Sequence, residues 1–212
     1  VLSRLDPMNK IREHILAANV TQLVIVSSFL SPKIKWGLID RLIVLAEQQG
    51  IKLSIVLNKK DLFDTSESSQ QEEWLSYIDG YRKIGYKLFI TEAAGQAPLD
   101  QDLVDVFKGN ISVIAGHSGV GKTSLINLLS PSFNLKTKEI SEKHKQGTHT
   151  TTFSEMLILE AYNSYIIDTP GIKGFGLVDI SKENLASYFP EFKKKSSFCK
   201  FKDCSHTKEP QC

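Results

Sequence analysis

The chain has 212 residues, of which 41% are hydrophobic, and its formal net charge of +2 is too small to indicate a partner. This length and composition predict one packed α/β domain with a small appendage, and they exclude an intrinsically disordered chain. No apolar run approaches membrane-spanning length, and the first residues, VLSRLDPMNKIREHI, lack the apolar stretch of a signal peptide, so we expect a soluble intracellular protein without a membrane partner.

Strands and helices are predicted to alternate along most of the chain. Short apolar runs rich in β-branched residues indicate buried strands, and apolar residues at helical spacing indicate helices. The predicted strands cover residues 23–28, 52–57, 86–90, 111–115, 156–159 and 165–167. The predicted helices cover residues 36–47, 67–84, 99–107 and 122–129, with Gly50 ending the first and Gly80 a candidate break in the second. This alternation predicts an α/β fold with a doubly wound, largely parallel sheet.

The sequence GHSGVGKT at residues 116–123 matches the phosphate-loop pattern G-x-x-x-x-G-K-[ST] and joins a predicted strand to a predicted helix. Glycines let successive backbone N–H groups, together with the helix N-terminus, face a β-phosphate. We predict that Lys122 reaches the β- and γ-phosphates and that the Thr123 hydroxyl binds Mg²⁺. An ordinary glycine-rich turn is the alternative. The predicted nucleotide contacts are Gly116, His117, Ser118, Gly119, Val120, Gly121, Lys122, Thr123 and Ser124.

A second motif, NKKD at residues 58–61, directly follows a predicted strand and matches the guanine-binding pattern NKxD. The Asp61 carboxylate can accept hydrogen bonds from guanine N1–H and from its 2-amino group, which adenine cannot offer, and such sites discriminate by roughly 10⁴ or more. We expect Asn58 to tie this loop to the phosphate loop and Lys59 to cover one face of the base, with Lys60 completing the motif. A solvated polar turn is the alternative.

Three further loops are candidates for contacts with the nucleotide. In DTPG, residues 168–171, Asp168 is predicted to hold Mg²⁺ directly or through water, and the Gly171 N–H to contact the γ-phosphate. The stretch GTHTTT, residues 147–152, is expected to supply a switch threonine that closes on Mg²⁺, Thr151 in preference to Thr150, although an ordinary mobile loop is the alternative. A third loop, TEA, follows the strand 86–90 and is a candidate base contact through Thr91, Glu92 and Ala93.

Four potential metal ligands lie close together near the C-terminus, namely Cys199, Cys204, His206 and Cys212. A Cys₃His set suits tetrahedral zinc and leaves no position for a catalytic water, so we predict one structural zinc. Metal binding would stabilise a Lys-rich segment that has few apolar residues. Reactive free thiols beside a surface histidine are the alternative. The lysines of this segment alternate with Phe192, Phe198 and Phe201, which is compatible with either RNA contact or a solvated face.

The order of the motifs is unusual, because NKxD precedes the phosphate loop. Every motif still follows a strand at one edge of the sheet, so the site itself is expected to be unchanged. The order NKxD, GxSGVGK[ST]SLxN, HTTT, DTPG and Cys-x₄-Cys-x-His-x₅-Cys resembles the RsgA (YjeQ) family of circularly permuted GTPases. The resemblance covers nearly the whole chain, including ANVTQLVIV and IDRLIVLAEQQGI before NKKD.

The resemblance implies a bacterial or organellar, cytoplasmic factor that binds the small (30S) ribosomal subunit and its rRNA late in assembly and hydrolyses GTP to GDP. We expect a permuted GTPase domain over residues 1–178, where the strand–helix alternation stops, and an incomplete zinc-binding segment over residues 179–212. The N-terminal OB-fold usual in the family is expected to be absent. We expect a monomer that binds GTP with Mg²⁺ and one Zn²⁺.

Hydrolysis is expected to be slow without help. In many GTPases a glutamine after D-x-x-G orients the attacking water, whereas Ile172 occupies that position and has no hydrogen-bonding group. The missing contribution could come from His149, from a backbone group or from the ribosome, of which the ribosome is the preferred interpretation. A GTP-dependent RNA-binding scaffold with little hydrolysis is the main alternative. A nucleotide kinase is disfavoured, because the chain lacks a lid-like arginine cluster and carries NKKD with DTPG.

Overall fold

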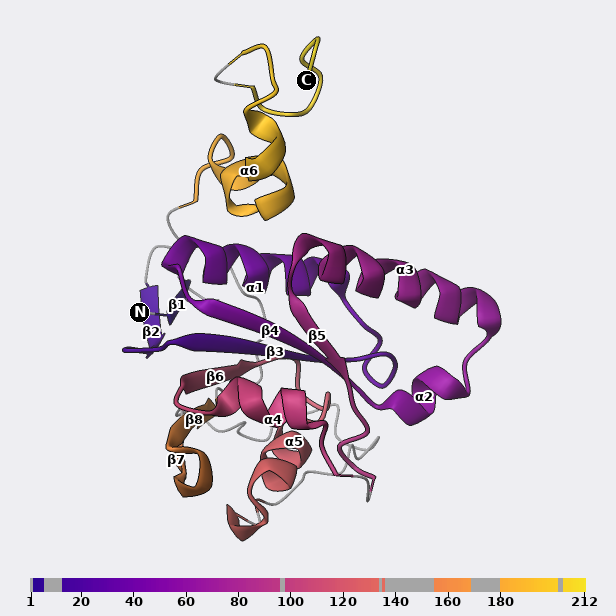
Figure 1. Ribbon diagram of the computed structural model, residues 1–212, viewed down its shortest axis with the longest axis vertical. Helices are drawn as coiled ribbons and strands as arrows, with labels where there is room; N and C mark the ends of the chain where they lie inside the picture. Colours follow the sequence, from indigo (N-terminus) through magenta and orange to yellow (C-terminus); the bar gives the residue numbers. More distant parts are fainter. Residues whose placement is uncertain are drawn as a thin grey trace.

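A six-stranded sheet forms the centre of the computed structural model, which describes residues 2–5, 13–95, 98–133, 135, 155–168, 180–201 and 204–212 (Figure 1). The strands lie in the order β5-β4-β3-β6-β8-β7, and every neighbouring pair is parallel except β7 and β8. The largely parallel sheet is therefore confirmed. The strands are β3 (Gln22–Ser28), β4 (Lys52–Asn58), β5 (Lys87–Ile90), β6 (Ile111–Ala115), β7 (Glu155–Leu159) and β8 (Ser164–Asp168).

Helices cover both faces of the sheet, as a doubly wound fold requires (Figure 1). Side chains of β3 alternate between the two cores because successive residues of a strand point to opposite faces: Leu23 packs with the first core and Val24 with the second. The first core lies under α1 (Trp36–Gln49) and α3 (Ser68–Ile84), and the second under α4 (Gln101–Phe107) and α5 (Lys122–Leu129).

Glycines at helix positions behave differently according to their backbone conformation. Gly50 adopts a left-handed conformation with φ of 62° and closes α1, as expected for a C-terminal cap. Gly80, by contrast, lies inside α3, which runs without a break to Ile84. The suggested interruption at Gly80 is therefore wrong, because the apolar residues on either side of it, Ile78 and Tyr81, are both buried and keep the helix packed.

Several short elements were not expected from the sequence. Strands β1 (Leu2–Leu5) and β2 (Glu13–Ala17) pair antiparallel in a separate two-stranded sheet. Helix α2 (Lys60–Asp64) is separated by one residue from the end of β4. Among the described residues there are also three short 3₁₀ helices, η1 (Pro131–Phe133), η2 (Glu160–Tyr162) and η3 (Leu185–Tyr188). None of the described helices combines the length and apolar character needed to cross a lipid bilayer.

The C-terminal segment, residues 180–201 and 204–212, stands at one end of the molecule next to α1 and α3 (Figure 1). It contains η3, which packs against α1, and α6 (Pro190–Ser196). At one margin of the sheet, β5 is the outermost strand, and the Arg82 guanidinium donates a hydrogen bond to the Leu88 carbonyl at 3.1 Å.

Candidate nucleotide and metal sites

The loops that follow three strands, and the last residue of a fourth, lie at the carboxyl edge of the sheet. NKKD begins at Asn58, the last residue of β4, TEA follows β5, the glycine-rich loop follows β6, and Asp168 is the last residue of β8. These strands are mutually parallel, so their carboxyl ends lie along the same edge. Ligands of open α/β sheets bind in the crevice outside this edge, which makes it the candidate nucleotide site.

The buried side chain of Asn58 holds three of these loops together. Its Nδ2 donates to the Val120 carbonyl at 2.9 Å, which joins NKKD to the glycine-rich loop. Its Oδ1 accepts hydrogen bonds from the Ala93 backbone N–H at 2.8 Å and the Thr91 hydroxyl at 3.1 Å, which joins NKKD to TEA. The Lys60 backbone N–H adds a bond to the Thr91 carbonyl at 3.0 Å. The link from Asn58 to TEA was not expected from the sequence.

Two glycines of the loop at residues 116–123 lie where no other residue fits. A Cβ atom added to Gly116 would come within 2.0 Å of the Val26 carbonyl oxygen. One added to Gly121, where φ is 98°, would come within 2.0 Å of Asn58 Nδ2. The loop therefore packs against β3 and against the last residue of β4, so that Gly116 and Gly121 are required by close approach, and Gly121 also by its backbone conformation.

The Lys122 side chain is buried against its own loop. Its ammonium donates to the carbonyl oxygens of Gly116 and His117, at 3.0 Å each. Burial lowers the pKa of Lys122, and the negative charge of Asp168 partly opposes that shift. Burial, with the charges of Lys35 and Lys122, likewise lowers the pKa of His117. The edge therefore holds a poorly solvated cation, to which an anionic group would be strongly attracted.

The NKKD side chains point in different directions. Lys59 has a left-handed backbone with φ of 63°, and its ammonium donates to the Ser31 carbonyl. Burial lowers the pKa of Lys59, while the charge of Asp61 opposes this shift. Lys60 forms an ion pair with Asp64 at 2.5 Å, whereas Asp61 is exposed in the first turn of α2. A carboxylate and a lysine stem are thus available beside this loop.

The remaining predicted site residues divide into two groups. Ser118 and Glu92 are exposed, and Thr123 and Ser124 are half-buried in the first turn of α5, beside Lys122. Thr150, Thr151, Gly171, Ile172 and His149 lie outside the described residues, so the two switch loops remain predictions.

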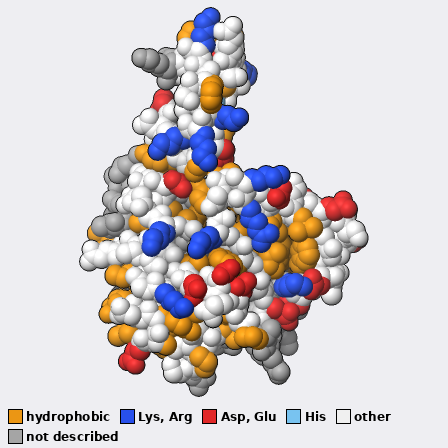
Figure 2. Space-filling model, in the orientation of Figure 1, with side chains coloured by type: hydrophobic (Ala, Val, Ile, Leu, Met, Phe, Trp, Pro, Cys, Tyr) orange, Lys and Arg blue, Asp and Glu red, His pale blue; other side chains and the backbone are white. Residues whose placement is uncertain are grey.

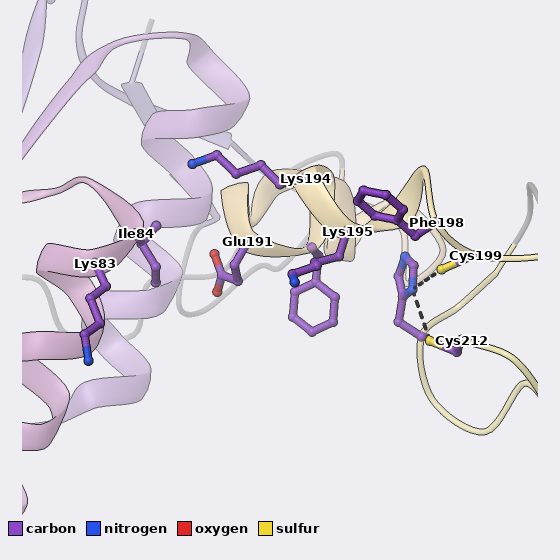
Figure 3. Close-up of a pocket in the computed structure, with 10 residues that line it drawn as sticks. Lys83, Ile84, Glu191, Lys194, Lys195, Phe198, Cys199 and Cys212 are labelled. Atoms are coloured by element: carbon purple, nitrogen blue, oxygen red, sulfur yellow. Dashed lines mark hydrogen bonds between the residues drawn. The ribbon is translucent and has the colours of Figure 1, made fainter.

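A metal-binding constellation forms in the C-terminal segment. The Sγ atoms of Cys199, Cys204 and Cys212 and a ring nitrogen of His206 all lie within 4.8 Å of one another. Cys199 Sγ and Cys212 Sγ are each 3.5 Å from His206 Nδ1 (Figure 3). None of the three thiols is in a disulfide. This arrangement can hold one metal ion.

The electrostatics of the cluster also favour a cation. Burial, together with the neighbouring thiols of Cys204 and Cys212, raises the pKa of Cys199 to about 11. Adjacent thiols resist ionisation because each thiolate would repel the next, whereas a bound cation stabilises the thiolates. A tetrahedral zinc with bonds of about 2.0–2.3 Å would hold its ligand atoms roughly 3.5 Å apart, as found for His206 and its two neighbours.

Comparison with known proteins decides the family. The family model described as RsgA GTPase matches residues 1–178. The chain belongs to the RsgA GTPase family. Two curated RsgA relatives carry the name small ribosomal subunit biogenesis GTPase. The relative from Flavobacterium psychrophilum is 42% identical over 94% of this chain, and the one from Bacteroides fragilis is 41% identical over 100% of it.

Solved structures support the same assignment. A structure described as YloQ, a circularly permuted GTPase, matches 92% of this chain with a TM-score of 0.70 and 34% identity, covering 59% of YloQ. YjeQ from Thermotoga maritima matches 92% of this chain with a TM-score of 0.71 and 32% identity, covering 62% of YjeQ. The fold is therefore that of a circularly permuted GTPase. The chain spans 60% of the F. psychrophilum RsgA relative and 66% of the B. fragilis one.

Proposed function

We propose that this chain binds GTP at the carboxyl edge of its sheet and hydrolyses it to GDP and phosphate while assisting late maturation of the small ribosomal subunit in the cytoplasm. The observation that best supports nucleotide binding is the Asn58 side chain, whose hydrogen bonds bring the base-recognition and phosphate loops together. The names of the RsgA relatives support the ribosomal role.

Guanine recognition is assigned to the NKKD and TEA loops. Asp61 accepts hydrogen bonds from guanine N1–H and the 2-amino group, and the Lys59 stem covers the base. The bond from Lys59 to the Ser31 carbonyl fixes the end of that stem. Thr91, Glu92 and Ala93 line the base from the next strand, and the backbone of Ala93 is already fixed by Asn58.

Phosphate binding is assigned to the glycine-rich loop and Lys122. The γ-phosphate lies between loop N–H groups and the Lys122 ammonium, whose buried position strengthens the attraction. Thr123, Asp168 and Thr151 would provide the oxygen ligands that Mg²⁺ prefers. Thr123 follows Lys122 in the first turn of α5, and the charge of Asp168 acts on Lys122. When bound, Mg²⁺ neutralises charge on the β- and γ-phosphate oxygens.

Turnover by the chain alone is proposed to be slow. In hydrolysis, a water oxygen bonds to the γ-phosphorus as the bond to the β-phosphate oxygen breaks, and charge grows on that leaving oxygen, where Lys122 can stabilise it. Orientation of the water requires a hydrogen-bonding group, which Ile172 lacks. We assign that contribution to the small subunit.

The C-terminal cluster is proposed to bind one structural zinc through Cys199, Cys204, His206 and Cys212. Residues 1–178 then form the GTPase domain, and residues 179–212 form a zinc-held segment that contributes to rRNA contact. We propose that the protein acts as a monomer. A GTP-dependent scaffold with little hydrolysis is the second candidate, favoured only by the apolar Ile172.

One measurement separates these two functions. GTP hydrolysis is followed with the chain alone and with purified small subunits, with binding verified by co-sedimentation. We expect slow intrinsic turnover and a large increase with subunits, since assistance in trans can be worth about 10³–10⁵ in rate. Fast intrinsic hydrolysis unchanged by bound subunits contradicts the proposal, and no stimulation despite binding supports the scaffold.

A further inference from the structure

Helix α2 carries Asp61 but has little packing of its own to hold it in place. None of its residues is buried, although the Phe63 ring lies with its centroid 4.9 Å from that of Phe29 and 5.8 Å from that of Trp74. Figure 2 shows charged side chains of both signs over the region of α2, in keeping with the exposure of Asp61 and Asp64. A helix of five residues is not stable alone, so its orientation depends on contacts from neighbouring elements.

One side chain of the next helix caps the C-terminal end of α2. Gln71 of α3 directs its side-chain amide at backbone carbonyls there, which need donors from outside the helix because they have no partner within it. Its Nε2 donates to the carbonyls of Phe63 at 2.9 Å and Ser66 at 3.0 Å, and more weakly to that of Asp64 at 3.4 Å. Trp74, one turn further along α3, is only 1% exposed, so the cap comes from a firmly packed helix.

The two ends of α2 are thus held by different parts of the fold. At its start, the Lys60 backbone N–H donates to the Thr91 carbonyl at 3.0 Å, which ties α2 to the loop after β5. At its end, Gln71 ties the Phe63 carbonyl to α3. Asp61 lies between these two attachments, about 3 Å along the helix axis from Phe63. A tilt of α2 at either end therefore changes the direction in which the Asp61 carboxylate faces.

We propose that Gln71 is a positioning residue for guanine recognition, which fixes α2 so that both oxygens of the Asp61 carboxylate face the base. The inference rests on the proposed guanine site and names a residue that sets its selectivity. A carboxylate that accepts from N1–H and from the 2-amino group together must lie in one orientation, because hydrogen bonds weaken steeply as they depart from linearity. Gln71 therefore controls whether the second of these bonds forms, and does not merely add stability to the fold.

Inosine nucleotides isolate that second bond, because their base keeps N1–H but has no 2-amino group. The dissociation constants of GDP and IDP are measured on the full chain by titration with Mg²⁺ present, and their ratio is the readout. We expect the wild type to bind GDP at least about tenfold more tightly than IDP, because the extra hydrogen bond is to a charged group. Gln71→Met, which keeps the chain length without a donor, is expected to weaken GDP binding about tenfold and IDP binding about threefold.

Matched variants separate the cap from the side chain's other properties. Gln71→Asn withdraws the amide by one methylene and is expected to behave as Gln71→Met does. Gln71→Lys keeps a donor at the end of α2, where the helix dipole also favours a cation, and is expected to retain at least about half of the wild-type ratio. Gln70→Met is the control, because Gln70 precedes Gln71 in α3 and no hydrogen bond joins its side chain to α2, whose residues are all described. It should change neither affinity by more than about twofold.

The free energy of unfolding of each variant is measured as well, so that lost stability is not mistaken for lost orientation. An unchanged ratio of the two dissociation constants in Gln71→Met, a loss in Gln71→Lys as large as in Gln71→Met, or an equal loss in Gln70→Met overturns the role of Gln71. The guanine site would survive those results as long as the wild type prefers GDP to IDP. A wild type that binds GDP, IDP and ADP equally well would instead overturn the guanine site, and this inference with it.

Discussion

At the residue scale, Asn58 and Asn110 form a natural comparison. Both are buried and make side-chain hydrogen bonds, but Asn58 lies at the carboxyl edge of the sheet and Asn110 at the opposite edge, before β6. Asn110 bonds to the carbonyls of Val106 and Lys108 and accepts from Thr21. Replacing each asparagine in turn therefore separates the loss of buried hydrogen bonds from damage to the candidate nucleotide site.

Asn58→Ala and Asn110→Ala are both expected to lower the free energy of unfolding by about 1–3 kcal/mol, because each leaves buried partners without hydrogen bonds. Only Asn58→Ala should also weaken GDP binding, by at least about tenfold, since it releases the loops at Val120 and Ala93 from each other. Denaturant unfolding and nucleotide titration measure the two effects. Equal GDP affinity in the two variants would contradict the role assigned to Asn58.

Asp61 provides a test of base selectivity. Asp61→Asn is expected to weaken GTP binding by at least about tenfold and to favour xanthosine nucleotides, whose 2-oxo group needs a donor from the protein. Asp64→Asn is the matched control, because Asp64 is also an exposed carboxylate of α2 but pairs with Lys60. Competition between GTP, XTP and ATP measures the change. If the wild type binds ATP as well as GTP, the assignment of NKKD is wrong.

At the scale of single elements, the two glycines near the end of α3 test backbone conformation alone. A Cβ atom at Gly80 or at Gly85 would meet nothing within 4 Å, so neither substitution changes packing. Gly80 is helical, whereas Gly85 caps the helix with φ of 116°. Gly80→Ala should stabilise the fold by about 0.5–1 kcal/mol, and Gly85→Ala should destabilise it by about 1 kcal/mol. Thermal or denaturant unfolding measures both changes, and a free energy of unfolding that changes in the same direction in both variants would refute this explanation.

The C-terminal segment provides the second test at this scale. None of the residues in α6 or η3 is buried, so the segment has little apolar core of its own. We expect about one zinc per chain, and we expect Cys204→Ser to lose both the metal and the ordered segment while GDP binding persists. Metal analysis of protein purified without chelator measures the zinc content, and amide hydrogen exchange of residues 180–212 measures the order of the segment. Protein free of zinc with the segment still protected would exclude the structural metal.

The elements that the sequence predicted correctly are those with a strong apolar pattern. β3, β4 and β6 are rich in buried apolar residues, and α1 and α3 bury a regular stripe. α2 and α6 bury nothing and so carry no such pattern. The sequence did contain a different indication of α6. Pro190 and Glu191 lie in its first turn and Lys193–Lys195 in its last, a distribution that helix geometry and the helix dipole favour.

The candidate site was predictable where chemistry is encoded locally, and less so where it depends on contacts between loops. The glycine-rich loop and NKKD were recognisable from spacing alone. The bonds from Asn58 to Thr91 and Ala93 join residues far apart in sequence, and the anchoring of Lys59 by Ser31 does the same. A single sequence gives no information on such pairings, because they depend on how neighbouring strands are ordered in the sheet.

At the scale of the whole molecule, circular permutation places the C-terminal segment directly after the loop that follows Asp168. In the usual order the corresponding loop leads back into the GTPase fold. Here the chain passes from β8 to a segment that packs against α1 and contributes to a groove with α3. In the proposed GTP complex, a change at the γ-phosphate would therefore have a short covalent path from Asp168 to the C-terminal segment.

Arg82 covers part of the outer edge of β5, where a second chain could pair in concentrated solution. β4 and β5 are parallel, and the Thr91 N–H donates to the Leu57 carbonyl of β4. Backbone groups of successive residues in a strand point to opposite sides, so the carbonyl of Leu88, three residues earlier, points away from β4. An outermost strand with open carbonyls can template pairing with another chain, which leads to aggregation. The Arg82 guanidinium occupies the Leu88 carbonyl, and the charged Lys87 stands beside it. Arg82 thereby removes one acceptor with which the edge strand of a second chain could pair.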